Sequence, residues 1–468
     1  MNIKKICIIG SGMGGGILAN EISKYTNTEV YLMDIYEIDK KPKENTKSIY
    51  NNEFLKNKRN LRSYGFGGSS ELWHGVLAKF KMKKKNNLKS EKIVNDYFGI
   101  ESSFFNKEQN LTNIEKIIDS DTTIVKKKFL IQKKPLRINN YLKKNKKIFF
   151  IENSIAIKIS KVSKNKVEIE YNQNNNYKKK LFDVVVLSCG TFETTRLLMQ
   201  SYEYLNLNYK KYKLGSYLRD HPWVQLGFIE KKNKKKFFYK LKDQKIDNNI
   251  FLRTGFEKKL NKNLNNHCFR VRFYNDKSYE NFKIKLKTNF KKNKLFLFKQ
   301  LFNLKELNFC IRLFIELFFS YVYTNKVELI LYFDQSKNID NKISLKRDLD
   351  KFGRRKINIK WCINNDDEKS LTSYQDLLTK LFSNTKYNYK KNTKYKFNPG
   401  YHFYGTLRNA NEDKNSILNG DKSLKEIKNA YVSDLSIYDD TDNSNPSYEL
   451  LKDSINLSLL LKKKLNLN

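Results

Sequence analysis

The sequence predicts a mixed α/β protein (α+β in its overall content) that has two domains. One is a doubly wound, Rossmann-like domain, and the other has a largely antiparallel sheet with covering helices. The first domain is indicated by two apolar runs that each lead through glycine into a helical pattern, at residues 6–22 and 183–198. The second is indicated by alternating apolar and polar residues at 269–273 and 356–361. Continuous apolar strands are typical of buried parallel sheets, whereas alternation is typical of half-exposed sheets.

The N-terminal unit has the order strand, glycine turn, helix, strand and acid. An apolar strand at residues 6–9 ends at the glycine-rich run 10–16, and apolar residues at helical spacing follow at 17–22. A second strand, at residues 30–33, is followed directly by Asp34. This order predicts a βαβ unit that begins a parallel sheet.

The glycine turn fits the pattern G-x-G-x-x-G at Gly10, Gly12 and Gly15. Such glycines permit a tight turn, close approach of a pyrophosphate to backbone N–H groups and close helix–strand packing. The pyrophosphate is held at the helix N-terminus, and Asp34, 24 residues after Gly10, is placed to bind a ribose diol. We therefore predict a dinucleotide site rather than an accidental glycine-rich turn, although the pattern does not distinguish NAD from FAD.

Further motifs follow in order along the chain. A second glycine cluster spans residues 65–75, and a strand-to-helix turn passes through Gly190. The C-terminal part contains H-x-x-G-T at residues 402–406, D-x-S at 434–436 and an Asn-Pro pair at 445–446. Taken alone, the second cluster reads equally well as a flexible loop, and the strand at 184–187 as one without a ligand contact.

In order and spacing, these motifs resemble those of the glucose-methanol-choline family of FAD-dependent oxidoreductases over essentially the whole chain; the match is weakest at residues 233–326. The resemblance implies FAD as cofactor, with the first glycine turn on its ADP half, the second glycine loop beside its ring system and Asp434 near its ribityl chain. The cofactor-binding residues implied are Gly10, Ser11, Gly12, Met13, Gly14, Gly15, Asp34, Gly67, Gly68, Ser69, Ser70, Ala156, Gly190, Glu193, Asp434, Leu435 and Pro446.

The chain departs from the family pattern at two places. Asp34 is followed by Ile35 and Tyr36 where the family usually continues with alanine and glycine. Some members attach FAD covalently through a histidine just before a tryptophan, and here Leu72 precedes Trp73. We therefore expect non-covalent FAD, with no role assigned to His74.

Oxidation of an alcohol removes a hydride from carbon and a proton from oxygen, so it needs a base and a polar group on the oxygen. A neutral imidazole suits the base at physiological pH. The resemblance matches His402 to the family's catalytic histidine and Asn445 to its partner, so we expect His402 to be the base and Asn445 to hold the substrate oxygen. The alternatives are a core histidine at 402 and a turn asparagine at 445.

The predicted FAD-binding domain is discontinuous and comprises residues 1–77, 149–215 and 400–468. The predicted substrate-binding domain and its connections comprise residues 78–148 and 216–399. We expect helices within 295–319 to cover the substrate-domain sheet with their aromatic stripe, as core packing rather than membrane contact. His221, before Pro222, is read as a structural strand start, and His267 as a surface residue.

The formal net charge of +43 comes from lysines spread through the whole chain, so we read it as a solvated surface and predict no nucleic-acid partner. Five widely separated cysteines predict neither a disulfide scaffold nor a metal site. We expect a cytoplasmic location, because no signal peptide is seen, and no integral membrane segment.

The expected substrate is a small-molecule alcohol, for which a sugar or polyol is one option, and the expected electron acceptor is oxygen, a quinone or a protein. The alternatives are a flavoprotein that acts on a different bond type and a catalytically degraded FAD-binding paralogue.

Overall fold

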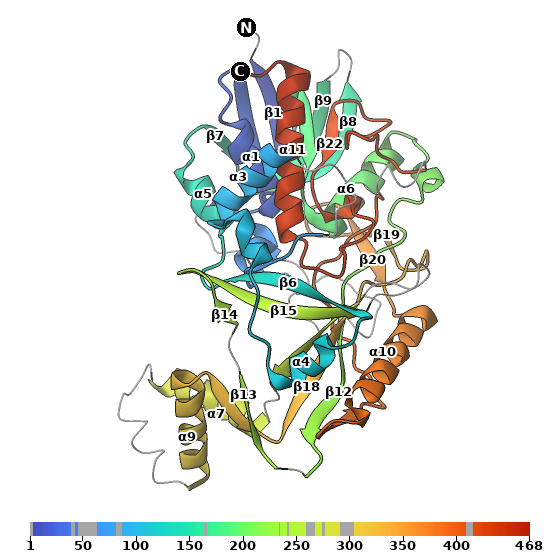
Figure 1. Cartoon of the computed structure of the whole chain (residues 1–468). Helices are drawn as coiled ribbons and strands as arrows, with labels where there is room; N and C mark the ends of the chain where they lie inside the picture. The colour runs from blue at the N-terminus through green and yellow to red at the C-terminus, as the bar shows by residue number, and fades with distance from the viewer. Residues whose placement is uncertain are drawn as a thin grey trace.

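The structure is a computed structural model that describes residues 3–38, 43–44, 63–80, 87–162, 166–233, 235–240, 243–258, 267–273, 277–290, 304–408 and 415–468. Its upper half in Figure 1 is built on a five-stranded parallel sheet in the order β22-β11-β1-β2-β7. The strands are β1 (Lys4–Ile9), β2 (Thr28–Met33), β7 (Ile148–Ile151), β11 (Val184–Leu187) and β22 (Ala430–Val432). This sheet, with strands from both ends of the chain, confirms the predicted doubly wound domain.

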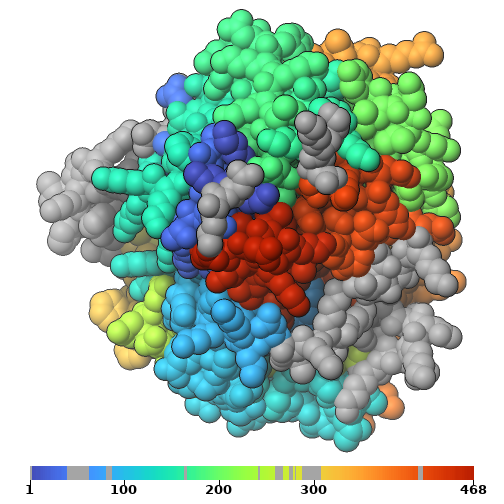
Figure 2. All heavy atoms as spheres, turned by 90° about the horizontal axis from the view of Figure 1, so that it is seen from above, coloured from blue at the N-terminus to red at the C-terminus, as the bar shows by residue number. Residues whose placement is uncertain are grey.

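The parallel sheet is buried on both faces, as its continuous apolar strands predict. Ile6 and Ile8 of β1 enter one hydrophobic cluster, and Cys7 and Ile9 enter another on the opposite face. The first face is covered by α1 (Met13–Ile22), α3 (Leu88–Phe98), α5 (Ile138–Lys144) and the C-terminal helix α11 (Ser447–Leu465). Figure 2 shows the C-terminal residues in red beside the N-terminal residues in blue.

The second face is covered by a long helix and a small antiparallel sheet. The helix is α6 (Gly190–Tyr204), and the sheet has the order β10-β9-β8. Its strands are β8 (Ser154–Val162), β9 (Lys166–Gln173) and β10 (Asn176–Phe182). The side chain of Ser201, on α6, accepts a hydrogen bond from the backbone of Ile159 in β8 at 2.9 Å, which ties the two together.

The lower half contains the predicted antiparallel sheet, in the order β21-β12-β18-β16-β15-β6-β5, with β14 also paired to β15. Its strands are β5 (Val76–Leu77), β6 (Ile124–Gln132), β12 (Trp223–Lys231), β14 (Gln244–Lys245), β15 (Ile250–Lys258), β16 (Cys268–Phe273), β18 (Lys326–Tyr332) and β21 (Tyr387–Lys391). Apolar residues of one face pack against α4 (Asn113–Asp119) and α10 (Asn365–Ser383). The opposite face is therefore turned toward the parallel-sheet half.

Several smaller elements complete the described chain. Two-stranded sheets pair β3 (Lys43–Glu44) with β4 (Ser63–Tyr64), β13 (Phe237–Lys240) with β17 (Tyr321–Thr324), and β19 (Lys342–Leu349) with β20 (Arg355–Lys360). The short 3-10 helices are η1 (Gly68–Glu71), η2 (Ser102–Asn106), η4 (Tyr209–Tyr212) and η5 (Leu435–Ile437). The predicted division of the chain into two discontinuous domains stays a prediction.

Two expectations differ from the structure. Helix α9 (Leu304–Phe318) contacts α7 (Lys277–Phe290) and lies at the lower left of Figure 1, and its Phe314 is 53% exposed and Phe318 71% exposed. The stripe is thus packed only in part, because Phe309 contacts Tyr279 and Phe282 of α7 whereas Phe314 and Phe318 are exposed. Residues 295–303 lie outside the described residues. His267, expected at the surface, is fully buried, because its Nδ1 accepts a hydrogen bond from the backbone of Asp334 and its ring packs on Phe333.

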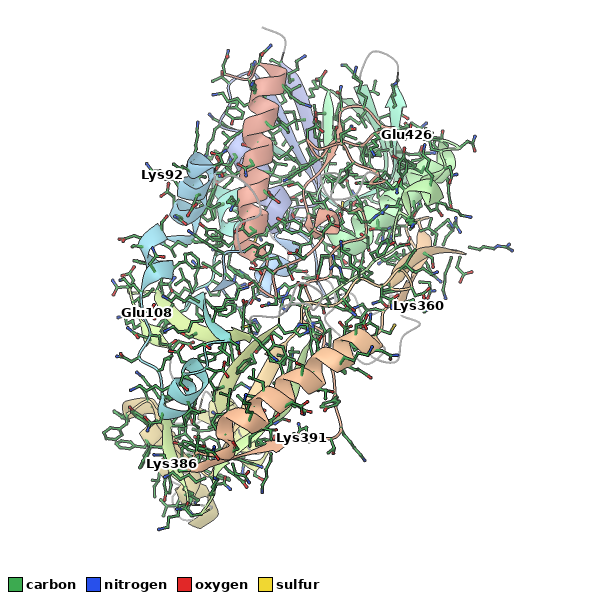
Figure 3. The ribbon with its side chains drawn as sticks, turned by 45° about the vertical axis from the view of Figure 1, so that its right-hand side comes forward. Lys92, Glu108, Lys360, Lys386, Lys391 and Glu426 are labelled. Carbon is green, nitrogen blue, oxygen red and sulfur yellow. The ribbon has the colours of Figure 1, made fainter. Side chains whose placement is uncertain are left out.

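The charged surface is spread over the molecule. Lys92, Lys360, Lys386 and Lys391 are exposed and lie on different parts of it (Figure 3). Among the described residues, we find no helix with both the length and the apolar character that crossing a bilayer requires.

Candidate active site

A cavity of about 820 Å³ lies where the two halves of the molecule meet. Four strands of the parallel sheet point their carboxyl ends at it, because the residues that follow β1, β2, β11 and β22 line it. Ligands of open α/β sheets bind at this edge. Residues of the large antiparallel sheet, including Trp223, Arg270 and Tyr332, line it from the other side.

The three glycines of the first turn have three different surroundings. Gly10 has φ +96°, and a Cβ there would meet the Ser188 carbonyl oxygen at 2.4 Å. A Cβ at Gly15 would meet the Gly10 carbonyl oxygen at 2.0 Å, so glycine permits the close contact of α1 with the turn. A Cβ at Gly12 would meet no atom within 4 Å. Gly10 and Gly15 therefore shape the turn, and Gly12 keeps it open toward the cavity.

The first turn of α1 suits an anion. Its N-cap, Gly12, supplies no side-chain acceptor for the free N–H groups, and the turn contains no acidic residue. Uncapped N–H groups and the helix dipole favour a negatively charged group at this end. Asp34 lies beside the turn, where its carboxylate accepts hydrogen bonds from the Ser11 backbone at 3.0 Å and the Ile35 backbone at 2.7 Å. Burial raises the pKa of Asp34, and these hydrogen bonds oppose the rise.

The second glycine loop packs directly on the first. The backbone N–H of Gly67 donates to the Ser11 hydroxyl at 3.1 Å, and the guanidinium of Arg137 holds the Ser70 carbonyl at 2.9 Å. Gly67 adopts φ +85° and starts a short 3-10 helix over Gly68–Glu71. Gly68, Ser69 and Ser70 line the cavity, whereas Gly67 shapes the loop from behind.

Asp434 joins the third motif to the C-terminal segment. Its carboxylate accepts hydrogen bonds from the Gly190 backbone at 3.1 Å, the Thr194 hydroxyl at 2.5 Å and the Ser436 backbone at 2.9 Å. Burial raises the pKa of this carboxyl, and these hydrogen bonds oppose the rise. Glycine at 190, with φ +76° and open space where a Cβ would lie, keeps the cavity wall thin at this point.

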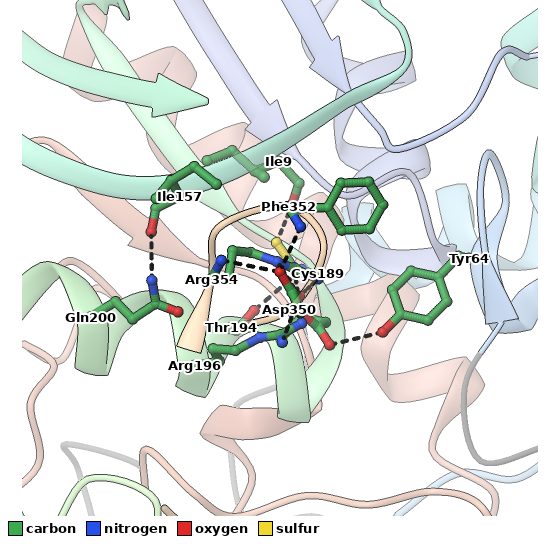
Figure 4. Close-up of polar contacts among 11 residues, drawn as sticks. Ile9, Tyr64, Ile157, Cys189, Thr194, Arg196, Gln200, Asp350, Phe352 and Arg354 are labelled. Atoms are coloured by element: carbon green, nitrogen blue, oxygen red, sulfur yellow. Dashed lines mark hydrogen bonds and ion pairs between the residues drawn. The ribbon is translucent and has the colours of Figure 1, made fainter. Parts of the chain in front are cut away.

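Glu193 is held in a cluster of ion pairs beside the same wall, with Arg196, Asp350 and Arg354, which Figure 4 labels. Its carboxylate pairs with the guanidinium groups of Arg196 and Arg354, and it accepts a hydrogen bond from the Tyr64 hydroxyl at 3.0 Å. Asp350 pairs with the same two arginines at 3.3 and 2.8 Å. The cluster anchors the β19–β20 hairpin on α6 and fixes the side chain of Glu193, which lines the cavity.

Two histidines meet at the other end of the cavity. The rings of His221 and His402 are stacked, with centroids 4.5 Å apart and planes at 10°. Both residues line the cavity together with Asn445. The Nδ1 atom of His402 and both ring nitrogens of His221 are buried without a hydrogen-bond partner. Buried imidazole nitrogens are normally satisfied, so these atoms point to a missing ligand.

Asp220 positions the segment that carries His402. Its carboxylate accepts three backbone N–H bonds, from Gly400 at 2.6 Å, Tyr401 at 3.2 Å and His402 at 2.9 Å. Burial raises the pKa of Asp220 to about 6, although these three hydrogen bonds favour its charged form. The position of the His402 backbone therefore depends on a carboxylate 182 residues earlier in the chain.

Burial also keeps the imidazoles neutral. Burial, with a smaller contribution from the nearby His74, lowers the pKa of His402 to about 4. It lowers the pKa of His221 well below 6.5, and the charges of His402, Arg270 and Lys127 add to the effect. A neutral imidazole at neutral pH is able to accept a proton from a hydroxyl group.

The structure brings nearly all of the predicted site residues to this one cavity, and Gly15 and Gly67 are the exceptions. Ala156, Leu435 and Pro446 line it as well, and their role in cofactor binding stays a prediction. Leu72 and His74 also line it and are exposed. Two residues that line the cavity, His221 and Arg270, were not expected here, nor was the contact of Asp220 with the His402 backbone. The Asp-His pair before Pro222 was the signal available in the sequence, and it did not indicate that the two histidine rings stack.

Solved structures of flavoenzymes share this fold. A formate oxidase from Aspergillus oryzae is 12% identical with a TM-score of 0.58, and the alignment covers 99% of each chain. A pyridoxine 4-oxidase from Mesorbium loti is 12% identical with a TM-score of 0.59, over 98% of this chain and 99% of that one. An FAD-dependent oxidoreductase from Chaetomium thermophilum is 11% identical with a TM-score of 0.59, over 99% and 100%.

No family model matches the chain, and a search of curated proteins finds no match. The similarity to known proteins is therefore one of fold, found among the solved structures. The chain has the fold of these FAD-dependent flavoenzymes, and its sequence motifs resemble those of the glucose-methanol-choline family.

Proposed function

We propose that the protein is an FAD-dependent oxidoreductase that oxidises a CH–OH group of a small-molecule alcohol to a carbonyl. The observation that carries this proposal is the joint placement of a glycine cradle open to an anion and two neutral, unpartnered imidazoles in one cavity. A dinucleotide fits the cradle, because Gly12 leaves open space and α1 offers uncapped N–H groups there.

The residues that would hold FAD follow from this placement. The N-terminus of α1 would bind the pyrophosphate of FAD, and Asp34 would bind a ribose. Asp434 and the turn at Gly190 would contact the middle part of the FAD molecule. Gly68, Ser69 and Ser70 would lie along its ring system, and no histidine occupies the position of Leu72, which favours non-covalent binding. When bound, FAD supplies the acceptor for the hydride that leaves the substrate carbon.

The chain's own residues manage the proton and the oxygen. The hydroxyl proton of the substrate passes to the neutral imidazole of His402, while the amide of Asn445 donates a hydrogen bond to the oxygen as negative charge develops on it. The C–H bond breaks with its electron pair, and the C–O bond becomes a carbonyl. His221 stacks on His402 and limits the rotation of its ring. Asp220 holds the backbone that carries it.

The test is the visible absorption spectrum of the purified protein, followed by anaerobic mixing with sugars, polyols, hydroxy acids and simple alcohols. We expect a flavin band that bleaches with one class of alcohol. In His402→Asn the same band should persist and bleach with dithionite but only slowly with that alcohol. This control separates loss of the base from loss of the cofactor.

Two outcomes would contradict the proposal. A flavin band that no alcohol bleaches would favour another flavin reaction or a catalytically degraded paralogue. A protein that takes up no FAD even after reconstitution would refute the cofactor assignment itself.

A further inference from the structure

An arginine lies at the junction of two cavities on the substrate side of the proposed site. Arg270 lines the cavity that contains the histidines, and it also lines a second cavity of about 570 Å³. Tyr332 is shared by both cavities in the same way. The guanidinium of Arg270 therefore stands between the proposed reaction centre and a polar space behind it.

The alternation of the large sheet puts Arg270 on this face. Phe269, Leu331 and Val224 point into the core beneath α10, so their neighbours in β16, β18 and β12 point the other way. These neighbours are Arg270, Tyr332 and Trp223, and all three line the first cavity. Tyr332 lies opposite Trp223 across one strand pair, so the three form a continuous surface.

The ring of Tyr332 lies 4.0 Å from the guanidinium carbon of Arg270, and the ring of Phe129 lies 5.2 Å away. Gly255 lies in van der Waals contact with the stem of this side chain, since a Cβ there would lie 3.4 Å from the Arg270 Cγ, and the same Cβ would clash with the Cys268 sulfur at 2.5 Å. The guanidinium is thus held in place by aromatic faces and a thin strand. Stacking of this kind orients a guanidinium but satisfies none of its N–H groups.

The carboxylates nearby are engaged with other groups. In the second cavity Asp243 pairs with Arg253 at 2.6 Å and Glu328 with Arg272 at 2.9 Å. Glu257, on the strand next to Arg270, pairs with Lys127 at 3.0 Å. Over the described part of the chain, Arg270 makes no ion pair or side-chain hydrogen bond, and its Nη1 atom is buried without an acceptor.

A buried guanidinium nitrogen such as Nη1 of the half-buried Arg270 is costly without an acceptor, and the fork of N–H groups matches the two oxygens of a carboxylate or the oxygens of a phosphate. We propose that Arg270 is the specificity-determining residue for an anionic group on the substrate, so that the enzyme oxidises an alcohol carrying a carboxylate or a phosphate. This inference rests on the proposed alcohol oxidation at His402. Arg270 also lies within electrostatic reach of His221, whose pKa it helps to lower.

The first experiment uses the wild-type holoenzyme and matched pairs of alcohols under anaerobic conditions. Glycolate is compared with ethylene glycol, gluconate with glucose, and glycerol 3-phosphate with glycerol, and the rate of flavin bleaching is measured. We expect one anionic member to have a kcat/KM at least about tenfold above its neutral partner, the lower bound for lost hydrogen bonds to a charged group. The carboxylate and phosphate pairs distinguish the two kinds of anion.

The second experiment compares Arg270→Met with Arg272→Met. Arg272 lies two residues further along the same strand and forms an ion pair with Glu328. It lines the second cavity but not the first. In Arg270→Met we expect the anionic substrate to lose about 10- to 100-fold in kcat/KM, mostly through KM, with little change for its neutral partner. Arg272→Met should keep the anion preference, and Arg270→Lys should restore part of it because it retains the charge.

A binding readout keeps the test independent of turnover. Titration of the holoenzyme with acetate or inorganic phosphate should perturb the flavin spectrum in wild type and in Arg272→Met but not in Arg270→Met. Equal rates for the charged and neutral members of every pair would overturn the role of Arg270 while leaving alcohol oxidation intact. Failure of every alcohol to bleach the flavin would instead overturn the proposed function, so the two failures are distinguishable.

Discussion

The rate of flavin reduction at acidic pH should show whether burial keeps the His402 imidazole neutral. The groups that surround this ring are the stacked His221, the nearby His74, the Asp220 carboxylate that accepts the His402 backbone N–H, and Arg270 behind His221. Burial dominates among them and lowers the pKa of His402 to about 4. The base should therefore stay active well below the pH at which an exposed histidine becomes protonated.

The size of the effect follows from this pKa. At about pH 5.5, an imidazole with a pKa of about 4 is almost entirely neutral, whereas only about a tenth of one with a pKa of 6.5 is neutral. We therefore expect kcat/KM for flavin reduction to be nearly flat from neutral pH down to about pH 5 and to fall about tenfold per unit below about pH 4. Because the two rings are stacked, the observed value belongs to the pair.

The assay is anaerobic stopped-flow reduction with a neutral alcohol, since such a substrate does not itself titrate in this range. A fall between about pH 7 and 6 that disappears in His402→Asn would refute the argument from burial, because it would show a histidine with an ordinary pKa, whereas a fall that persists there belongs to another group such as Asp220, whose pKa burial raises to about 6. A profile without any acid limb in His402→Asn, at a much lower rate, would confirm that the limb belongs to this ring.

The same burial links His402 to stability. Its pKa is lower in the folded chain than in the unfolded chain, so between about pH 6.5 and 4 the unfolded chain binds more protons and stability falls as the pH falls. The difference corresponds to about 3 kcal/mol. Asp220 acts in the opposite sense, because its raised pKa makes stability fall as the pH rises from about 4 to 6. The difference in unfolding free energy between wild type and His402→Asn, measured as a function of pH, isolates the contribution of this histidine.

Three further changes have distinct expected results. His402→Ala should keep FAD but slow flavin reduction at least about 100-fold, as for loss of a general base, and an unchanged rate would remove this residue from the mechanism. Asp34→Ala should raise the dissociation constant of FAD without changing the hydride step in the remaining holoenzyme, and a normal dissociation constant would contradict its assignment. Arg354→Met should lower the unfolding free energy by about 2–3 kcal/mol, below the full cost of breaking a buried pair because Arg196 remains beside Glu193, and denaturant unfolding measures it.

The cofactor end of the site could be predicted from local sequence because its chemistry is local. The turn between β1 and α1 needs glycine for reasons of backbone angle and close contact, and those needs are met within a few residues. The acid after β2 lies beside it because neighbouring parallel strands end at the same edge of the sheet. Short-range sequence pattern and sheet geometry were therefore sufficient to predict that the glycine turn and this acid lie side by side.

The substrate end could be predicted only in part. His402 and Asn445 came from the family resemblance, whereas His221 reaches His402 across 181 residues of sequence through the fold of the large sheet. His267 was misread because its hydrogen bonds are made with Asp334 and Tyr374, which lie far along the chain and which no local pattern reveals. Helix α9 was misread because an apolar stripe shows that a face is apolar but not what covers it.

The two sheets contribute different groups to the site, and this difference limits where substrate specificity can change. The parallel sheet presents backbone N–H groups and two hydrogen-bonded carboxylates at its edge. Asp34 accepts from the Ser11 backbone, and Asp434 accepts from the Gly190 backbone and the Thr194 hydroxyl. The large sheet presents one face of alternating side chains, whose opposite face is locked in the core beneath α10. Substitution of a cavity-facing residue such as Trp223 or Arg270 leaves that core packing in place. Selectivity for the substrate should therefore be alterable on this face at little cost in stability, whereas changes in the glycine turns should cost cofactor binding first.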